Sequence, residues 1–259
     1  MFSAIKTSIV LGTLMVIASG TLAQSFERGG MGYAVLGPSW IFSSRVDDYL
    51  SRPEVLGSSY QPTAFGFMWG GEGFVIRHRI LIGGSFEGSN PLEIKTSTAT
   101  VNEFYASFNF RTGYIFWDRG SNFMNFNLGT GFMTHSFDIR NDKAPDGIFF
   151  NQEYPVNLGE QRSYSYGGFD FDFGVGVKKV LGSSAGDKMS GVMLGIDAGC
   201  FLNIPTGGWY NTYDMNEIIY GPPSPGVSAV PYIRLVIGGG GFKSGVPVGK
   251  GEETPPPQK

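Results

Sequence analysis

The feature that most constrains this chain is a strict alternation of side-chain type over "NEFYASFNFRTGYIFWD", residues 102–118. In a β-strand successive side chains point to opposite faces, so residues two apart share a face. The apolar face would comprise Phe104, Ala106, Phe108, Phe110, Thr112, Tyr114 and Phe116. The opposite face would comprise Glu103, Tyr105, Ser107, Asn109, Arg111, Gly113 and Ile115. The pattern predicts a long strand with one phenylalanine-rich face and one polar face that carries both charge signs.

The same period of two recurs along most of the chain and predicts further strands. Composition agrees, because 40 Gly and 22 Phe in 259 residues are typical of β structure with tight turns. The pattern is weakest in the first segment, which Pro38 interrupts. The eight expected strands lie within 29–42, 64–76, 79–88, 102–116, 122–138, 169–180, 191–202 and 230–242.

Long and short connections alternate between these strands. The long ones are residues 43–63, 88–98, 140–165 and 203–228, and the short ones lie near 77–79, 118–121 and 181–190. An even number of strands joined in this way places all long loops at one end and all short turns at the other. Outer-membrane barrels have this asymmetry, with short periplasmic turns and longer extracellular loops. The expected fold is therefore an all-β, closed antiparallel up-and-down transmembrane β-barrel of eight strands.

Two environments compete for the apolar faces: the core of a soluble β-sandwich, or lipid around a barrel. The strands at 102–116 and 122–138 exceed the roughly 5–6 residues typical of soluble strands. They reach the roughly 9–11 residues that a tilted spanning strand needs. The polar faces are rich in glycine, as a narrow interior requires, and the apolar faces carry large aromatics without small partners to interlock with. These features favour lipid, and eight strands leave room only for side chains inside, so no open channel is expected.

The chain termini carry separate signals. Lys6, the apolar run Ile9–Ala18 and the sequence Thr21-Leu22-Ala23 predict a cleaved secretory signal peptide over residues 1–23. The barrel would then occupy residues 24–243, and residues 244–259 would form a disordered, proline-rich periplasmic tail. The expected location is the outer membrane of the cell. The formal net charge of −3 and the absence of a basic run predict no nucleic-acid partner.

Charged residues on the inward faces cluster at similar depth along the strands. Unpaired charges in so dry a space are costly, so we expect the charged groups to pair. Arg111 and Arg234 are each expected to bridge two carboxylates, with Asp197 and Arg234 as the best single pair. The predicted luminal charge network comprises Glu72, Glu87, Glu103, Arg111, Asp170, Asp172, Asp197 and Arg234.

Few residues of the sequence support a catalytic role. His135 and Ser136 resemble the His and Ser of outer-membrane lipid A deacylases, but their spacing and strand context differ. As neighbours in a strand they point to opposite faces. His78 is expected to be a solvated turn residue. The two scattered histidines and the lone Cys200 make no conventional metal site. No catalytic residue, cofactor or metal is predicted.

The hairpins rich in Gly and Phe, with the stretch "RHRILIGGSFEG", support a family resemblance over residues 29–243. The chain resembles small eight-stranded outer-membrane barrels, broadly similar to the barrel domain of OmpA and to Bacteroidetes outer-membrane proteins. The resemblance concerns the fold, and our first hypothesis for the function is a structural or interaction protein that contacts outer-membrane lipid. Its extracellular loops would recognise another membrane-complex subunit or an extracellular ligand. The alternatives are a lipid-modifying enzyme that uses His135 and a soluble exported barrel that binds an apolar ligand. The loop recognition candidates are Tyr154, Tyr164, Trp209, Tyr210, Tyr213 and Tyr220.

Overall fold

The computed structural model describes residues 26–40, 44–62, 65–150, 155–185, 187–212, 214–219 and 222–244. The expected signal peptide and the tail beyond residue 244 lie outside the described residues. The described chain is almost entirely antiparallel β-structure, with one short helix, α2 (Ser44–Leu50). No helix in the described part of the chain is long and apolar enough to cross a membrane.

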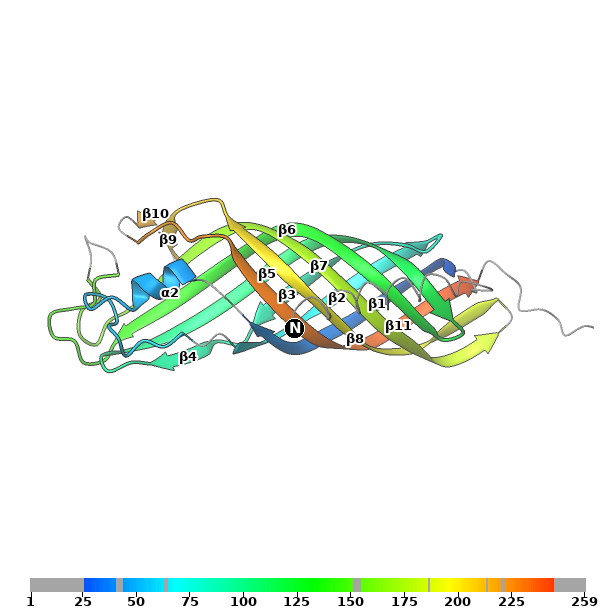
Figure 1. The fold of residues 1–259 in the computed structure, drawn as a ribbon, viewed down its shortest axis with the longest axis horizontal. Helices are drawn as coiled ribbons and strands as arrows, with labels where there is room; N and C mark the ends of the chain where they lie inside the picture. The colour runs from blue at the N-terminus through cyan, green and yellow to red at the C-terminus, as the bar shows by residue number, and fades with distance from the viewer. Residues whose placement is uncertain are drawn as a thin grey trace, which may run out of the picture.

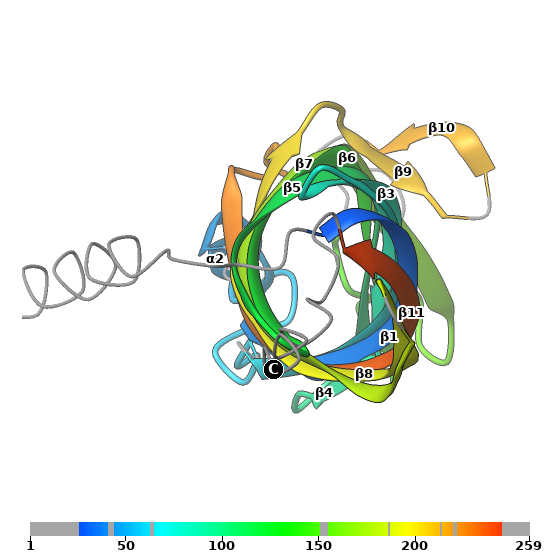
Figure 2. The same cartoon turned by 90° about the vertical axis from the view of Figure 1, so that its right-hand side faces the viewer.

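Eight long strands close into a ring, as the alternation predicted (Figures 1 and 2). Each strand pairs antiparallel with the next, β1 pairs with β11, and the pairing of β7 with β8 completes the circle. The ring strands are β1 (Phe26–Trp40), β2 (Phe65–Arg77), β3 (Ile80–Ser89), β5 (Ala99–Arg119), β6 (Asn122–Asn141), β7 (Gln161–Ala185), β8 (Lys188–Pro205) and β11 (Ser228–Ser244). Pro38 lies within β1 without ending the strand.

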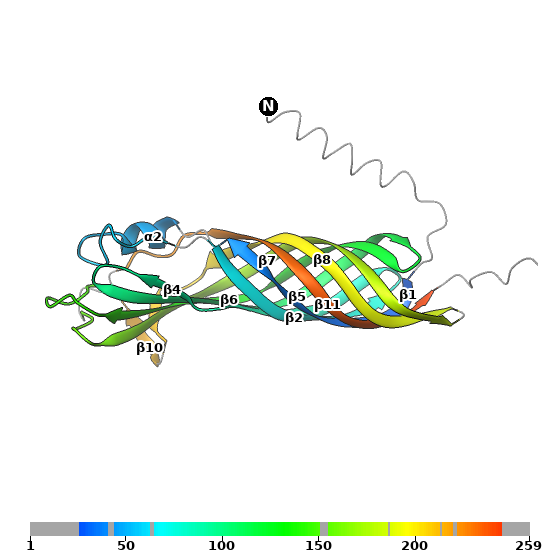
Figure 3. The same cartoon turned by 90° about the horizontal axis from the view of Figure 1, so that it is seen from below.

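The two ends of the ring differ. At the short-turn end, His78 and Arg79 form the β2–β3 turn with positive φ angles of 49° and 69°. Such angles match the twist of a two-residue hairpin. The Arg79 guanidinium lies 2.6 Å from the Asp118 carboxylate, which ties this turn to β5. At the long-loop end lie α2 and three short strands, β4 (Leu92–Lys95), β9 (Trp209–Asn211) and β10 (Asp214–Ile219) (Figures 1 and 3).

Several strands are longer than the sequence pattern indicated. Residues 161–165 were expected in a loop, but they belong to β7, which pairs with β6 from Arg140↔Gln161 onward. In this part of β7, Tyr164 and Tyr166 point inward and pack in an apolar cluster at the long-loop end. A second apolar cluster, with Phe26, Phe123 and Phe242 in edge contact, fills the short-turn end. The ring therefore has apolar packing at both ends and polar side chains between them.

The outer surface of the ring is apolar where a soluble protein would be polar. Phe108 is 63% exposed and Phe132 is 65% exposed, whereas the inward Arg111 and Asp172 have no exposed surface. Exposed large apolar residues lie on every ring strand except β1, where the outward Leu36 and Trp40 are half-buried. A continuous apolar belt of this kind is stable against lipid and not against water. This arrangement overturns the soluble alternative, and we call the surface the lipid-facing band.

The assignment of the lipid-facing band can be tested by comparing two exposed leucines. Leu128 lies midway along the outer face of β6 and is 44% exposed, whereas Leu158 lies in the 142–160 connection and is 56% exposed. Replacing Leu128 by arginine is expected to lower the free energy of unfolding in lipid vesicles by about 2–4 kcal/mol. Leu158→Arg should change it by less than about 0.5 kcal/mol. Urea titration followed by tryptophan fluorescence measures both. Equal effects of the two substitutions would contradict the lipid-facing assignment.

Candidate functional site

The middle of the ring holds a buried network of charged side chains centred on Arg111. From β5, the Arg111 guanidinium contacts the carboxylates of Glu72, Glu87 and Asp172, with 3.1 Å separating it from Glu87. Arg234 on β11 contacts Glu72, at 2.9 Å, and Glu87. The two arginines therefore share two glutamates, as expected for arginines that bridge carboxylates. All five side chains are buried, so each charge depends on the others for compensation.

A second ion pair joins Lys178 to Asp197, with 2.5 Å between the Nζ and carboxylate atoms. The expected Asp197–Arg234 pair was wrong, although the two residues face each other directly across β8 and β11. The long Arg234 side chain lies over the Tyr232 ring at 4.0 Å and reaches the two glutamates. Lys178 takes its place beside Asp197. Sequence reasoning missed Lys178 as a network member, although the alternation of β7 already placed it on the inward face.

Hydroxyl and amide groups complete the network, and the sequence pattern did not single them out. Tyr33 donates to Glu72 at 2.9 Å and Tyr232 donates to Asp172 at 2.8 Å. Asp170 accepts a hydrogen bond from the Asn109 amide at 2.8 Å. The other carboxylate oxygen of Asp170 has no hydrogen-bond partner, and none of the ion pairs within the described residues includes Asp170.

Two inward glycines make room for the charged side chains. A Cβ atom at Gly129 would lie 3.1 Å from Asp172 Cβ and 3.2 Å from Arg111 Cγ. A Cβ atom at Gly176 would overlap the Asp197 carboxylate. The glycine-rich inward faces thus follow from the space that the ion pairs require.

The remaining predicted network residue, Glu103, lies apart from Arg111, nearer the long-loop end. Its carboxylate lies 2.6 Å from Nε2 of His135, and the Tyr166 hydroxyl lies 2.8 Å from the other ring nitrogen of His135. His135 is only 2% exposed. Ser136 points to the opposite face and bonds to Ser165. An imidazole enclosed in this way has no approach for a lipid substrate, so the geometry does not favour the lipid-modifying alternative.

The connections at the long-loop end fold over the ring as a cap, which we define as residues 44–62, 90–98, 142–160 and 206–227 where described. Hydrogen bonds hold it together: the Tyr49 hydroxyl donates to the Phe150 carbonyl of another segment at 2.6 Å, and the Trp209 indole donates to the Pro223 carbonyl within 206–227 at 3.0 Å. Phe150 stacks on Tyr164 with ring centroids 4.1 Å apart. The cap shares one apolar core with the upper interior of the ring.

The cap's packing corrects part of the predicted recognition set. Tyr164 and Trp209 are each 2% exposed, because they are anchors of the cap core and not surface residues. Tyr210 is half-buried on the outer side of the wall, where its hydroxyl lies 3.4 Å from that of Thr134. Tyr154, Tyr213 and Tyr220 lie outside the described residues. Periodicity could not separate an exposed loop aromatic from one that packs inward.

Fold and site together define a transmembrane β-barrel with a charged interior and a folded cap. No family model and no curated protein sequence matches the chain. Neisserial surface protein A shares 11% identity over 83% of this chain and 96% of its own length, with a TM-score of 0.39. The outer-membrane protein OprG from Pseudomonas aeruginosa shares 11% identity over 85% of this chain and 97% of its own, with a TM-score of 0.34. The outer-membrane protease OmpT from Escherichia coli shares 9% identity over 86% and 99%, with a TM-score of 0.32. At such identities the likeness concerns the fold alone, and the resemblance to OmpA and Bacteroidetes barrels stays a prediction.

Within the described residues no group of three or more His, Cys, Asp or Glu side chains has the arrangement of a metal site. The ion pairs around Arg111 can be tested by their effect on stability. Replacing Arg111 by methionine is expected to lower the free energy of unfolding by about 3–5 kcal/mol, because three buried carboxylates lose their shared cation. Asp170→Asn should be near neutral or stabilising, because it removes a charge that no cation contacts and keeps an acceptor for Asn109. Urea unfolding in lipid vesicles measures both. A larger loss for Asp170→Asn would show that Arg111 does not hold the network together.

The cap contains a carboxylate whose protonation affects docking. Burial against the cap core raises the pKa of Asp47 in α2 from 3.8 to about 6, with Glu103 adding to the rise and His135 opposing it. The folded state then binds a proton that the undocked segment releases, so docking of residues 44–62 weakens as the pH rises through about 6.

Limited proteolysis of residues 44–62 should therefore be slower at pH 5 than at pH 7.5. Asp47→Asn is expected to give the slow rate at both pH values. Asp48→Asn, an adjacent exposed carboxylate in the same helix, serves as the control, and both variants are compared with the parent at each pH. An unchanged pH dependence in Asp47→Asn would contradict this role of Asp47.

Proposed function

We propose that this chain is an outer-membrane protein that presents a rigid cap outside the cell and has a non-catalytic, structural or interaction role. The short-turn end would face the periplasm and the cap would face the exterior, as in other small barrels. The partner would be another subunit of a membrane complex or an extracellular ligand. The chain would reach this site by export with a cleaved signal peptide.

The packing of the cap is the observation that carries this proposal. Loops placed on a rigid scaffold are the usual position of recognition residues. In this cap the backbone at Phe149 is held in place. Its N–H donates to the Glu54 carbonyl at 3.2 Å, and the neighbouring Phe150 is buried in the cap core. The isolated bridge Ile148↔Val156 orders the same connection. Ordered segments lose less entropy on binding than free loops do.

Apolar side chains remain exposed on this ordered surface. Phe149 is exposed beside the buried Phe150, Leu158 follows the Ile148↔Val156 bridge, and Val227 precedes β11. They lie beyond the lipid-facing band, so lipid does not cover them. The buried charge network gives no support for a conducting or catalytic role, because Arg111, Arg234 and Lys178 are each held by carboxylates inside the closed ring.

Photo-crosslinking in intact cells tests the proposal. Benzoylphenylalanine placed at Phe149 or Leu158 is expected to yield a discrete adduct with a protein or glycan. The same probe at Phe108, which is similarly exposed at 63% on the lipid-facing band, should yield lipid adducts. Discrete adducts from Phe108 and none from the cap would contradict a recognition role for the cap.

A further inference from the structure

The wall of the ring changes its pairing at the long-loop end of β7. Gly168 pairs with Pro205 of β8, but Ser165 pairs with Tyr210 of β9. Between these pairs the chain bows outward through Thr206, Gly207 and Gly208, and all three residues are exposed. The Thr206 N–H still donates to the Gly167 carbonyl at 3.2 Å. The strand pairing with β7 is interrupted at these residues, and a Cβ atom built at Gly207 or Gly208 would meet no atom within 4 Å.

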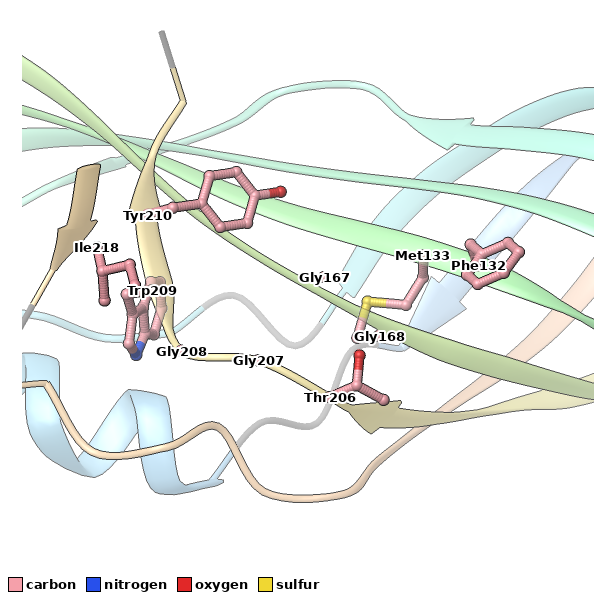
Figure 4. A pocket seen from close by; sticks show the side chains of 10 residues that line it. All are labelled: Phe132, Met133, Gly167, Gly168, Thr206, Gly207, Gly208, Trp209, Tyr210 and Ile218. Carbon is pink, nitrogen blue, oxygen red and sulfur yellow. The ribbon is translucent and has the colours of Figure 1, made fainter. Parts of the chain in front are cut away.

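A pocket of about 400 Å³ occupies this opening (Figure 4). Small-molecule pockets in proteins commonly measure about 300–1,000 Å³. Its side chains are mostly apolar, and none of the described residues that line it is charged. The lining comprises Phe132, Met133, Trp209 and Ile218, the hydroxyl-bearing Thr206 and Tyr210, and the backbones of Gly167, Gly168, Gly207 and Gly208.

The pocket opens at the outer edge of the lipid-facing band. Phe132 is exposed and lies between Phe108 and Phe169, with the Phe169 ring 5.4 Å away. The next outward residue of β6 is Thr134, whose hydroxyl meets that of Tyr210, so polar groups begin one strand position further on. The pocket is thus continuous with the surface that lipid covers on one side, and it borders hydroxyl groups on the other.

We infer that this pocket binds one acyl chain of a lipid from the surrounding leaflet. The uncharged, apolar lining fits a hydrocarbon chain and gives no counter-charge for an ionic ligand. The hydroxyls of Tyr210 and Thr206 lie where they can donate to the ester oxygens at the top of such a chain. Binding would be selective for a lipid that reaches past Phe132 toward Trp209, which bulk lipid does not contact. This inference rests on the membrane-spanning ring and is independent of the partner proposed for the cap.

Trp209 supplies the probe, since it lines the pocket and is otherwise enclosed. A protein in which Trp40, Trp69 and Trp117 are replaced by phenylalanine would be held in dodecyl maltoside micelles free of other lipid and titrated with doxyl-labelled phosphatidylcholine. Quenching of Trp209 is expected to saturate at a low fraction of labelled lipid. The variant Gly207→Leu/Gly208→Leu fills the opening and should weaken this quenching by about tenfold or more in apparent affinity.

Two controls separate the pocket from general lipid contact. Gly73→Leu introduces the same side chain into equally open space on the outer face of β2, and it should leave Trp209 quenching unchanged. A protein that retains only Trp69, which is 47% exposed on the band, should show quenching that rises in proportion to labelled lipid. Proportional quenching at Trp209, or unchanged quenching in the filled variant, would overturn the inference.

Native mass spectrometry of the otherwise unmodified protein gives a second measurement that does not depend on the tryptophan replacements. One retained phosphatidylglycerol or phosphatidylcholine molecule per chain is expected after detergent exchange, and its loss is expected in Gly207→Leu/Gly208→Leu. Equal retention in that variant and in the parent would place the lipid elsewhere on the barrel and contradict the inference.

Discussion

The pairing of β7 with β8 is the contact on which the rest of the structure depends, because it closes the ladder of backbone hydrogen bonds into a ring. In hydrocarbon no water satisfies a free strand edge, so an open sheet of the same strands would leave a row of polar groups unpaired. Closure also fixes which face each side chain takes. Once the phenylalanines of the band point outward, every residue between them must enter the interior, whatever its polarity.

Because closure directs every second residue inward, many charged side chains lie together in a small interior. An eight-stranded ring has an interior about as wide as the side chains that fill it. Desolvated charges are tolerated there only where opposite charges and hydrogen-bond donors reach them. Arg111 and Arg234 satisfy this condition by sharing Glu72 and Glu87, and the glycines opposite them leave the necessary room. The network is thus a consequence of closure, and it makes the interior a specific arrangement instead of a loosely filled one.

The sequence predicted the strands and their faces well, because both depend on a period of two that every spanning strand must obey. It predicted the depth of the inward charges for the same reason. It failed where the outcome depends on distances across the ring. Asp197 and Arg234 are adjacent across two strands, but their partners were decided by side-chain length and by Lys178 on the other neighbouring strand. Tyr164 and Trp209 were misplaced because the cap core forms from segments far apart in the chain, and no local pattern records that contact.

The opening beside β7 follows from the same constraint as the ring. Pro205 has no N–H to donate, so the β8 ladder ends readily at this residue, and β9 then pairs with β7 on its own. Deep in the band such a break would leave backbone groups unsatisfied in hydrocarbon. At the edge of the band, Thr134, Ser136 and Ser165 supply hydroxyl groups and the break costs little. Because the pairing of β7 is interrupted at the edge of the lipid-facing band, the pocket lies at the depth where the acyl chains of lipids meet their ester groups.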